Sequence, residues 1–544
     1  MNQRSIIILT LFCLLLPVKN VFAQEPEKKA EEPPKLEIPE ITIVGKKAIT
    51  LPFARKGEIF DVDLFEAPMP DSSLLGHPPS MSLLSGALPR YEQRQQPWRA
   101  SVEGKLGNFG TGSARGFLDY KGERWSLTNT LGFMTTGGHT TNASSSNFGA
   151  GSTARWVVKT DNQVLKSFRA SAGLNFSRDA FGLFGITSST VRRTDNEFSL
   201  AANLGTLDRT SGVLDIDLSA IFTSLNDSYS GIDSSVSIVS PQIRALYSTR
   251  IKNIEVTAAA SYSGSSLDYG HATQSPSLAD IMLGGAWNFG ERWRLSLGGT
   301  HASGTDNRGV DQTLTSVQAL LELDVDSVTT LNFWFRPHMN LSSYPQHVRI
   351  NPYVSREIEL RPERAPMNFG SSLYFWNGIF TLALKGNYEQ LSDKGLTIAD
   401  SGAIRLEYGA ARIASVEMEG SVGTSRGSRL QFSGSLTSAH EPGSAAQLPM
   451  VPVVRLQGRG EIDVRLPLTA WSSVDYQGPR NVDRQGVSAL SGVVLWNVGV
   501  STSAIARILL SGEIRNLLDT RYEWWNGYVA PGIEFNVAAK VNLQ

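Results

Sequence analysis

The amino-acid sequence predicts an all-β protein: a transmembrane antiparallel β-barrel of about 22 strands (range about 16–24) that follows a short irregular N-terminal leader. Three observations support this class. From about residue 96 to the end of the 544-residue chain, apolar and polar residues alternate within segments of roughly 8–12 residues. Clusters of Gly, Asn, Asp and Ser separate these segments. No segment offers the run of ~20 apolar residues that a membrane-spanning helix needs.

The N-terminus predicts export from the cytoplasm. A short basic start is followed by an apolar run over residues 5–18 and by a small-residue cleavage site between Ala23 and Gln24. The run is shorter than the ~20 residues of a permanent anchor, so we assign residues 1–23 to a signal peptide, with a retained anchor as the alternative. Cys13, the only cysteine, lies inside this peptide. A barrel held by its strand ladders needs no disulfide.

The segment after the signal peptide predicts a spacer and then a strand. Residues 24–39 are rich in Pro, Glu and Lys, which is typical of an extended, disordered linker. An isolated extended strand leaves its backbone donors and acceptors open, so it can add to the sheet edge of a partner protein. A plain first strand of a folded domain is the alternative. The residues of this segment, 40–45, are Glu40, Ile41, Thr42, Ile43, Val44 and Gly45.

Residues 46–95 form a leader without a sustained hydrophobic period. Prolines recur through it, which disfavours regular helices and strands. Phe53, Phe60, Leu64 and Phe65 make it too apolar for a free linker. We therefore expect the leader to be irregular and to pack against another surface, with the lumen of the barrel as one candidate.

Residues 96–544 are predicted to form the barrel. Side chains alternate between the two faces of a strand, so the alternation gives each segment one apolar face. A soluble sandwich shows the same alternation, but segments near the ~9–11 residues of a tilted spanning strand favour a membrane barrel. At roughly 20 residues per strand and turn, this length gives about 22 strands. The clearest apolar face is Ile533, Phe535, Val537, Ala539, Val541 and Leu543; the aromatic residues expected at the membrane interfaces are Trp293, Phe333, Trp334, Trp376, Trp524, Trp525 and Tyr528.

Composition excludes several classes of protein. The 50 basic and 51 acidic residues balance, whereas a nucleic-acid surface needs a net basic footprint. A hydrophobic content of 41% is too low for a helical membrane protein, and charged residues, at 19%, are fewer than in an average soluble protein. The 50 glycines fit a protein with many turns.

No arrangement of residues predicts catalysis, a metal site or a cofactor. The seven histidines are scattered, and the glycines of residues 107–116 miss the spacing of a nucleotide loop and fit the turn of a first hairpin. Paired carboxylates can act as acid and base, but lumen-facing acids at period two are the simpler explanation. We therefore predict that the chain is not an enzyme. The carboxylates concerned are Glu322, Asp324 and Asp326, Glu357 and Glu359, and Glu417 and Glu419.

The C-terminal part of the chain carries motifs of a known family. Residues 516–522 (Asn-Leu-Leu-Asp-Thr-Arg-Tyr), the later Ala-Pro-Gly and the terminal alternating strand resemble the C-terminal end of TonB-dependent receptor barrels. Residues 351–353 and 360–364 resemble the Asn-Pro and Leu-x-Pro-Glu turn of those barrels, with further matches at 415–420 and 448–452. The resemblance is specific over about residues 350–544. The motif residues it marks are Asn351, Pro352, Leu360, Pro362, Glu363, Asn516, Leu517, Asp519, Tyr522, Pro531 and Gly532.

The resemblance also gives a role to residues 40–45. They resemble the TonB box, which lends an extended strand to the energy-transducing protein TonB. Two departures from the family stand out. The family carries a much longer globular plug where this chain has only residues 46–95, and Leu543-Gln544 replaces the usual terminal aromatic residue. We therefore expect a plugless or plug-reduced member of the family.

Two functions remain open at this point. One is transport or channel activity for an unidentified ligand bound by outward loops near residues 135–147 and 179–196. The other is a structural or assembly role in an outer-membrane complex, with a partner protein in or against the barrel. Both place the barrel in the outer membrane of a diderm bacterium, in contact with lipid, with a periplasmic N-terminus and no nucleic-acid partner. Because a barrel of this size encloses a wide lumen, the leader, the loops or a partner must fill it.

Overall fold

The computed structural model of the chain describes residues 98–159, 167–185, 190–206, 212–229, 232–400, 403–423, 428–464 and 467–543. The chain divides into two compact units, Met1–Pro70 and Asp71–Gln544, and all described residues belong to the second. The predicted signal peptide with its Ala23/Gln24 cleavage site, the spacer over 24–39, the TonB-box-like residues 40–45 and the leader over 46–95 lie outside the described residues.

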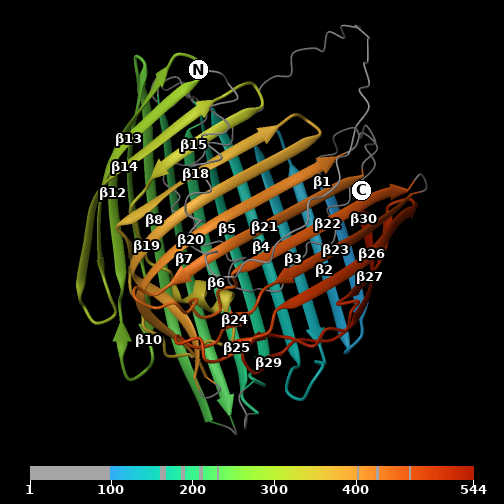
Figure 1. The fold of residues 1–544 in the computed structure, drawn as a ribbon. Coiled ribbons are helices and arrows are strands. Elements are labelled where there is room, and N and C mark those ends of the chain that lie inside the picture. Colours follow the sequence, from blue (N-terminus) through green and yellow to red (C-terminus); the bar gives the residue numbers. More distant parts are fainter. Residues whose placement is uncertain are drawn as a thin grey trace, which may run out of the picture. The chain divides into compact units, whose positions relative to one another are not determined.

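Twenty-two antiparallel strands form a closed barrel, as predicted (Figure 1). In chain order they are β1 (Trp98–Gly107), β2 (Thr111–Lys121), β3 (Trp125–Thr136), β4 (Ser145–Lys159), β5 (Ser167–Gly182), β6 (Arg192–Thr206), β7 (Val213–Tyr229), β8 (Ile232–Ile251), β9 (Ile254–Gly264), β12 (Ser277–Phe289), β13 (Trp293–Thr305), β14 (Asp311–Asp324), β15 (Thr329–Phe335), β18 (Met367–Trp376), β19 (Phe380–Asp400), β20 (Ala403–Gly423), β21 (Arg429–His440), β22 (Val454–Val464), β23 (Leu468–Gln477), β26 (Val493–Ile505), β27 (Ile508–Arg515) and β30 (Glu534–Leu543).

The barrel closes where the first strand meets the last. β1 pairs with β30 from Ala100↔Leu543 to Gly107↔Asn536, so no edge strand is left open. Two short strands, β10 (Ser266–Asp268) and β11 (Thr273–Gln274), pair with each other, and β10 also pairs with β8. They prolong β9 and β12 beyond the main wall.

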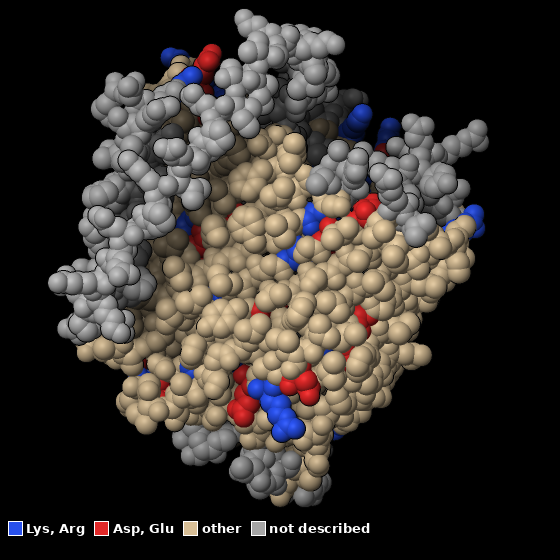
Figure 2. All heavy atoms as spheres, turned by 45° about the vertical axis from the view of Figure 1, so that its right-hand side comes forward, with Lys and Arg blue, Asp and Glu red and all other residues tan. Residues whose placement is uncertain are grey.

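The two faces of each strand differ in chemistry as the alternation predicts. On β30 the apolar set faces outward, with Phe535 49% and Val537 66% exposed, while Asn536 on the other face is 7% exposed. Glu322 and Glu417 lie on lumen-facing positions, opposite Arg294 and Lys385 respectively. Much of the outer surface in Figure 2 is uncharged, as contact with lipid requires. Among the described residues no helix is long and apolar enough to cross a membrane.

The barrel has a turn end and a loop end. At the turn end, residues 122–124 suffice to join β2 to β3, and residues 506–507 join β26 to β27. At the loop end, residues 336–366 join β15 to β18 and residues 516–533 join β27 to β30. Because the number of strands is even, β1 begins and β30 ends at the same end, which is the turn end.

The long connections at the loop end contain the remaining elements. Residues 336–366 hold β16 (His338–Asn340), α2 (Tyr344–Ile350) and β17 (Glu363–Ala365), and β16 pairs with β17. Residues 478–492 hold the paired strands β24 (Arg480–Asn481) and β25 (Ala489–Leu490). Residues 516–533 hold β28 (Glu523–Trp525) and β29 (Tyr528–Val529), which pair with each other.

Aromatic side chains gather at the turn end on the outer face. Trp125 and Trp156 are direct cross-strand partners, and Trp293 faces Phe289 in the same way; all four are exposed. Tyr120 stacks on Trp125 at 4.5 Å between ring centroids. This arrangement fits an interfacial belt.

The aromatic prediction was wrong for four of the residues named for such a belt. Trp334 lies opposite the buried Leu320 on the lumen face. Trp525 and Tyr528 are buried in a loop-end cluster, and Trp524 packs against that cluster. The reason is that large rings also fill space in an interior, and alternation alone does not separate a lumen position near a covering loop from a lipid-facing one.

The first hairpin confirms the expected turn. Thr111 N donates to Asn108 O at 3.1 Å, and both residues between them, Phe109 and Gly110, have positive φ. This is the two-residue turn whose twist matches a hairpin.

Two predicted outward loops are shorter than expected. The loops predicted at 135–147 and 179–196 overlap the ends of strands, because β3 runs to Thr136 and β4 begins at Ser145, while β5 runs to Gly182 and β6 begins at Arg192. In these strand ends polar side chains bond across the sheet, as Asn147 does to Asp179, and such residues resemble loop residues in a sequence.

Candidate functional site: the lumen cap

The loop end of the lumen is covered by the chain's own connections, which we call the lumen cap. The cap comprises residues 336–366, 441–453, 478–492 and 516–533, together with the tip of the β19–β20 hairpin. Ser355 N donates to Ile404 O at 2.6 Å, so the tip extends its hydrogen bonding into the first of these connections. On the other strand of the tip, Ala399 N donates to Val482 O at 3.5 Å. The hairpin therefore lies between two loops that come from different parts of the wall.

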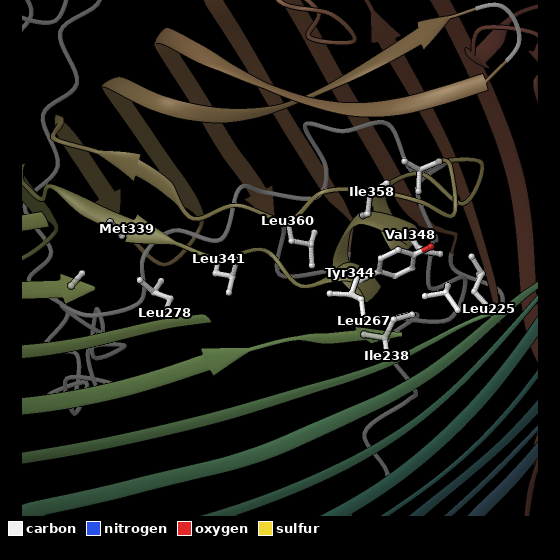
Figure 3. Close-up of a cluster of buried hydrophobic side chains, with 13 residues drawn as sticks. Leu225, Ile238, Leu267, Leu278, Met339, Leu341, Tyr344, Val348, Ile358 and Leu360 are labelled. Carbon is white, nitrogen blue, oxygen red and sulfur yellow. The ribbon is translucent and has the colours of Figure 1, made fainter. Parts of the chain in front are cut away.

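Residues 336–366 pack on the inner wall through an apolar cluster (Figure 3). Tyr344 and Leu360 are fully buried against Leu225 of β7, Ile238 of β8 and Leu267 of β10. A lumen face is normally polar, so apolar side chains at these positions mark a wall that the cap covers permanently. Each such side chain contributes about 1.5–3 kcal/mol when it is buried fully.

A buried arginine ties this segment to the wall. Arg193 of β6 is 2% exposed and donates from Nε and Nη2 to both carboxylate oxygens of Asp227, at 2.7 and 2.8 Å. Its Nη1 donates to the carbonyl oxygens of Pro352 and Val354, at 2.9 and 2.6 Å. Four residues further along the same face of β6, Glu197 accepts a hydrogen bond from Arg349. The guanidinium is fully paired, as a buried charge must be.

Three connections from distant parts of the barrel meet at one aromatic junction. Tyr353 stacks on Tyr528 with 3.6 Å between ring centroids, and Phe184 packs edge-on against both, at 6.0 and 5.1 Å. Phe184 follows β5, Tyr353 follows β15 and Tyr528 follows β27, so the junction reaches across the lumen. Burial raises the pKa of Tyr353 to about 12, which keeps the phenol neutral. This junction therefore ties three connections together at the loop end of the barrel.

A second set of polar contacts fixes the other side of the cap. Arg480 donates to the carbonyl oxygens of Glu523 and Trp524, at 2.8 and 2.9 Å. Burial, reinforced by the charge of Arg455, lowers the pKa of Arg480 to about 10. Glu363, 8% exposed, pairs with Lys394 Nζ at 3.1 Å. These contacts join residues 478–492 to residues 516–533, and residues 336–366 to the β19 wall.

The cap carries a charged hollow of about 580 Å³ between residues 355–361 and the β20 tip. Glu357 and Glu359 were predicted to share a strand face, but they lie in the irregular segment between α2 and β17. Glu359 pairs with Arg361, and Glu407 pairs with Arg484 at 3.3 Å. With carboxylates and guanidinium groups side by side, the hollow can bind a polar or charged ligand. It is lined by Ser355, Glu357, Glu359, Arg361, Arg405, Leu406, Glu407 and Tyr408.

The carboxylates of the described residues do not form a metal site. Within the residues that the structure describes, no group of three or more His, Cys, Asp or Glu side chains has the geometry to hold a metal ion. Asp326, predicted to lie on the strand face of Glu322 and Asp324, belongs to the β14–β15 turn, where its Oδ1 accepts from Val328 N at 2.9 Å.

The upstream family-motif residues lie in the cap. Asn351 ends α2 and its Oδ1 accepts from Tyr353 N at 3.0 Å, while the Pro352 carbonyl accepts from Arg193. Leu360 is fully buried in the apolar cluster. Pro362 is also buried, and Glu363 forms the pair with Lys394. The motif therefore positions the segment that crosses the lumen.

The downstream motif residues shape the last connection. Asn516 Oδ1 accepts from Thr520 N at 2.9 Å, and Asp519 Oδ1 accepts from Ile533 N at 2.9 Å. A Cβ at Gly532 would lie 2.4 Å from Asp519 Oδ1, so a larger residue there would displace the Asp519 carboxylate. Tyr522 packs edge-on against Trp524 at 5.2 Å. Leu517 N donates to Trp496 O at 2.7 Å, and the Pro531 carbonyl accepts from Asn516 Nδ2 at 3.4 Å.

The sequence prediction missed the residues that lock the cap. Arg193 and Asp227 were not singled out, and neither was Phe184. The only signal in the sequence is that Arg193, Asp195 and Glu197 share one strand face, which also fits a solvated lumen. The partner of Arg193 at residues 352–354 is about 160 positions away, so no local pattern connects them.

The barrel is similar to several solved transporters. The copper transporter OprC matches with a TM-score of 0.64 at 12% identity, over 82% of this chain and 80% of that one. The FrpB iron transporter from Neisseria meningitidis (F3-3 variant) matches with a TM-score of 0.66 at 8% identity, over 83% and 82%. This is the barrel fold of the TonB-dependent receptors. The predicted fold resemblance is thereby confirmed.

The likeness to known proteins is seen in the structure and not in overall sequence identity. The ferric yersiniabactin uptake receptor FyuA from Yersinia pestis matches this receptor-type barrel with a TM-score of 0.58 at 15% identity, over 83% and 81% of the two chains. No model of a known protein family matches the sequence, and no curated protein matches it. OprC and FrpB are named as transporters and FyuA as an uptake receptor, which agrees with the prediction that this chain is not an enzyme. The chain has the fold of an outer-membrane β-barrel.

Proposed function

We propose that this barrel takes up a ligand across the outer membrane and that its resting state is closed by the lumen cap. The junction of Tyr353, Tyr528 and Phe184 carries the proposal, because it joins three distant connections across the loop end. A wide barrel closed in this way opens only when the cap moves. The transport activities named for OprC, FrpB and FyuA support a metal ion or a metal chelate as the ligand class.

The proposed orientation places the loop end outside the cell. β1 begins and β30 ends at the turn end. This supports a periplasmic location for the turn end and for the N-terminus. A ligand from outside would then first meet the charged hollow at Glu357, Arg361 and Glu407. Residues 40–45 would present an extended strand to TonB, which supplies the work of moving the cap.

Conductance of the full-length protein in planar bilayers tests the closed state. We expect almost no conductance at rest, because the cap covers the lumen. The matched variant is Tyr353→Ala with Tyr528→Ala, which removes the junction while leaving every barrel strand intact, and it should show frequent large openings. Large steady conductance of the unaltered protein would contradict a closed resting state.

Dependence on TonB has its own test. Replacing Ile43 by Pro removes a backbone donor from the strand that residues 40–45 would add, whereas Ile43→Val keeps it. Cross-linking to TonB should be lost in the first variant and kept in the second. Equal cross-linking of both variants would remove TonB from the proposal.

A structural role is the second candidate. It is favoured by the contacts of the cap, in which the buried Arg193 and Arg480 and the partly buried Lys394 all have partners. In that case the barrel would stay closed under all conditions and would act through a partner protein. Uptake of a metal chelate into cells that carry the protein, compared with cells that lack it, distinguishes the two roles.

A further inference from the structure

The inner wall near the barrel closure contains a second hollow, of about 590 Å³, below the cap. It lies along a row of lumen-facing positions that are direct cross-strand neighbours: Lys540, Glu103, Arg115, Gly132 and Gly149. These positions come from β30, β1, β2, β3 and β4. The hollow is thus part of the rigid wall and not of a loop.

The floor of this hollow lacks side chains. Gly132 and Gly149 face each other across β3 and β4, and Gly151 follows on the same face of β4. A Cβ at Gly149 would have its nearest neighbour 3.8 Å away, so neither packing nor backbone geometry requires glycine there. The glycines leave open a surface that ordinary side chains would fill.

Free positive charge borders this floor. Among the described residues, neither Arg115 nor Lys540 has an ion-pair partner, although Glu103 lies between them in the row. By contrast, Lys105 on the next lumen-facing position of the same wall pairs with Glu513 at 2.9 Å. The two unpaired cations therefore point to a missing anion.

An exposed aromatic ring and an amide complete the hollow. Phe117 lies on the lumen face, because it pairs with Ser101 and Thr130 in the next row, and it is 39% exposed. Apolar side chains on the lumen face elsewhere, such as Leu225 and Ile238, are covered by the cap. Asn175 leans over Gly151, with its Oδ1 2.6 Å from where a Cβ would be. A flat group lying on the glycines would contact both side chains.

We propose that this hollow binds an organic polyanion, with its carboxylate or phosphate groups held by Arg115 and Lys540 and its flat part resting on the glycine floor beside Phe117. Charge-assisted hydrogen bonds from Arg115 and stacking on Phe117 would supply the affinity. The biological use of this site rests on the proposed transport function, because a transported ligand of this class would bind there after it passes the cap. The binding itself does not depend on transport.

Equilibrium binding to the full-length protein in detergent tests the proposal. The probe is pyranine, a flat trisulfonated pyrene dye, followed by fluorescence anisotropy. We expect saturable binding that weakens at least about tenfold in Arg115→Gln, because a charged hydrogen-bond donor is lost. Gly149→Val should abolish binding by filling the floor. A flat dicationic dye should not bind to any of these proteins.

The matched control is Gly104→Val. Gly104 alternates with Glu103 and therefore faces lipid, and nothing lies within 4 Å of its Cβ position. This variant carries the same substitution in the same sheet, so pyranine binding should be unchanged. Absence of pyranine binding, or equal binding by Arg115→Gln and the unaltered protein, would overturn the site. Because uptake is not measured, a failure of the transport proposal would leave this result unaffected.

Discussion

The two halves of the lumen are built from the same strands but have different chemistry. On β7, Leu225 near the loop end is fully buried under the cap, whereas Asp215 and Asp217 near the turn end accept hydrogen bonds from Asn203, both at 2.7 Å. On β8, Ile238 belongs to the buried half, while Arg244 faces the polar half. The wall is apolar where a permanent partner covers it and polar where it faces water or a ligand. The composition of a lumen face thus shows which part of a barrel is filled.

Removing residues 341–362 of the cap should have the largest effect, because these residues cover the apolar half of the lumen. Asn340 and Glu363 are cross-strand partners, so a short Gly-Asn-Gly turn can replace residues 341–362 without moving either strand. We expect planar-bilayer conductance to rise from almost none to that of a wide pore. Replacing turn 252–253 by Asn-Gly at the opposite end is the control and should change nothing. If the shortened protein stays closed, something other than the cap fills the lumen.

The buried arginine should give the next largest effect. Arg193→Met leaves Asp227 unpaired and frees the carbonyl oxygens of Pro352 and Val354. Breaking one side of a buried pair costs about 3–5 kcal/mol, so amide hydrogen exchange in residues 352–355 should accelerate strongly. The control is Arg99→Met, which removes a pair whose arginine is 67% exposed and should cost about 1 kcal/mol or less. Similar effects of the two substitutions would show that the cap does not depend on Arg193.

Acid should weaken the cap through His347 of α2. The Nε2 atom of His347 is buried without a hydrogen-bond partner among the described residues. Burial lowers the pKa of His347 to about 4; the charge of Lys394 adds to this shift and that of Glu363 opposes it. When the cap opens, the histidine returns toward its usual pKa of about 6.5, so the open form binds more protons between pH 6.5 and 4.

The stability of the closed cap should therefore fall as the pH falls through that window, by at most about 1.4 kcal/mol per pH unit for one proton. Protease cleavage within residues 341–362, measured between pH 7.5 and 4, reports this opening. His347→Gln carries no titrating group and should flatten the pH dependence. An unchanged profile in that variant would assign the effect to other groups.

The smallest effect should come from the pairwise coupling of Tyr353 and Tyr528. Stacked rings contribute about 0.5–1.5 kcal/mol beyond their buried area. A double-mutant cycle with Tyr353→Leu and Tyr528→Leu, read out by hydrogen exchange in the cap, isolates this coupling. Strict additivity would mean that the stack closes the lumen by shape alone.

Much of the fold was predictable because it depends on local alternation. The terminal strand shows this: Phe535 and Val537 were assigned to one face and are exposed together on the outer wall. A strand places successive side chains on opposite faces whatever its partners are, so the pattern needs no tertiary information. The motif residues at 351–363 and 516–532 were also identified from the sequence. The sequence did not show that they position the connections of the cap.

By itself the sequence determined the barrel class, the approximate number of strands and the apolar face of each strand, because strand periodicity and membrane thickness act on short segments. Only the tertiary structure decided what closes the loop end. Arg193 meets residues 352–354, and Phe184 meets Tyr353 and Tyr528, across separations of more than 150 positions. Such contacts arise because barrel closure brings distant connections to one end, and no periodicity along the chain records which of them will touch.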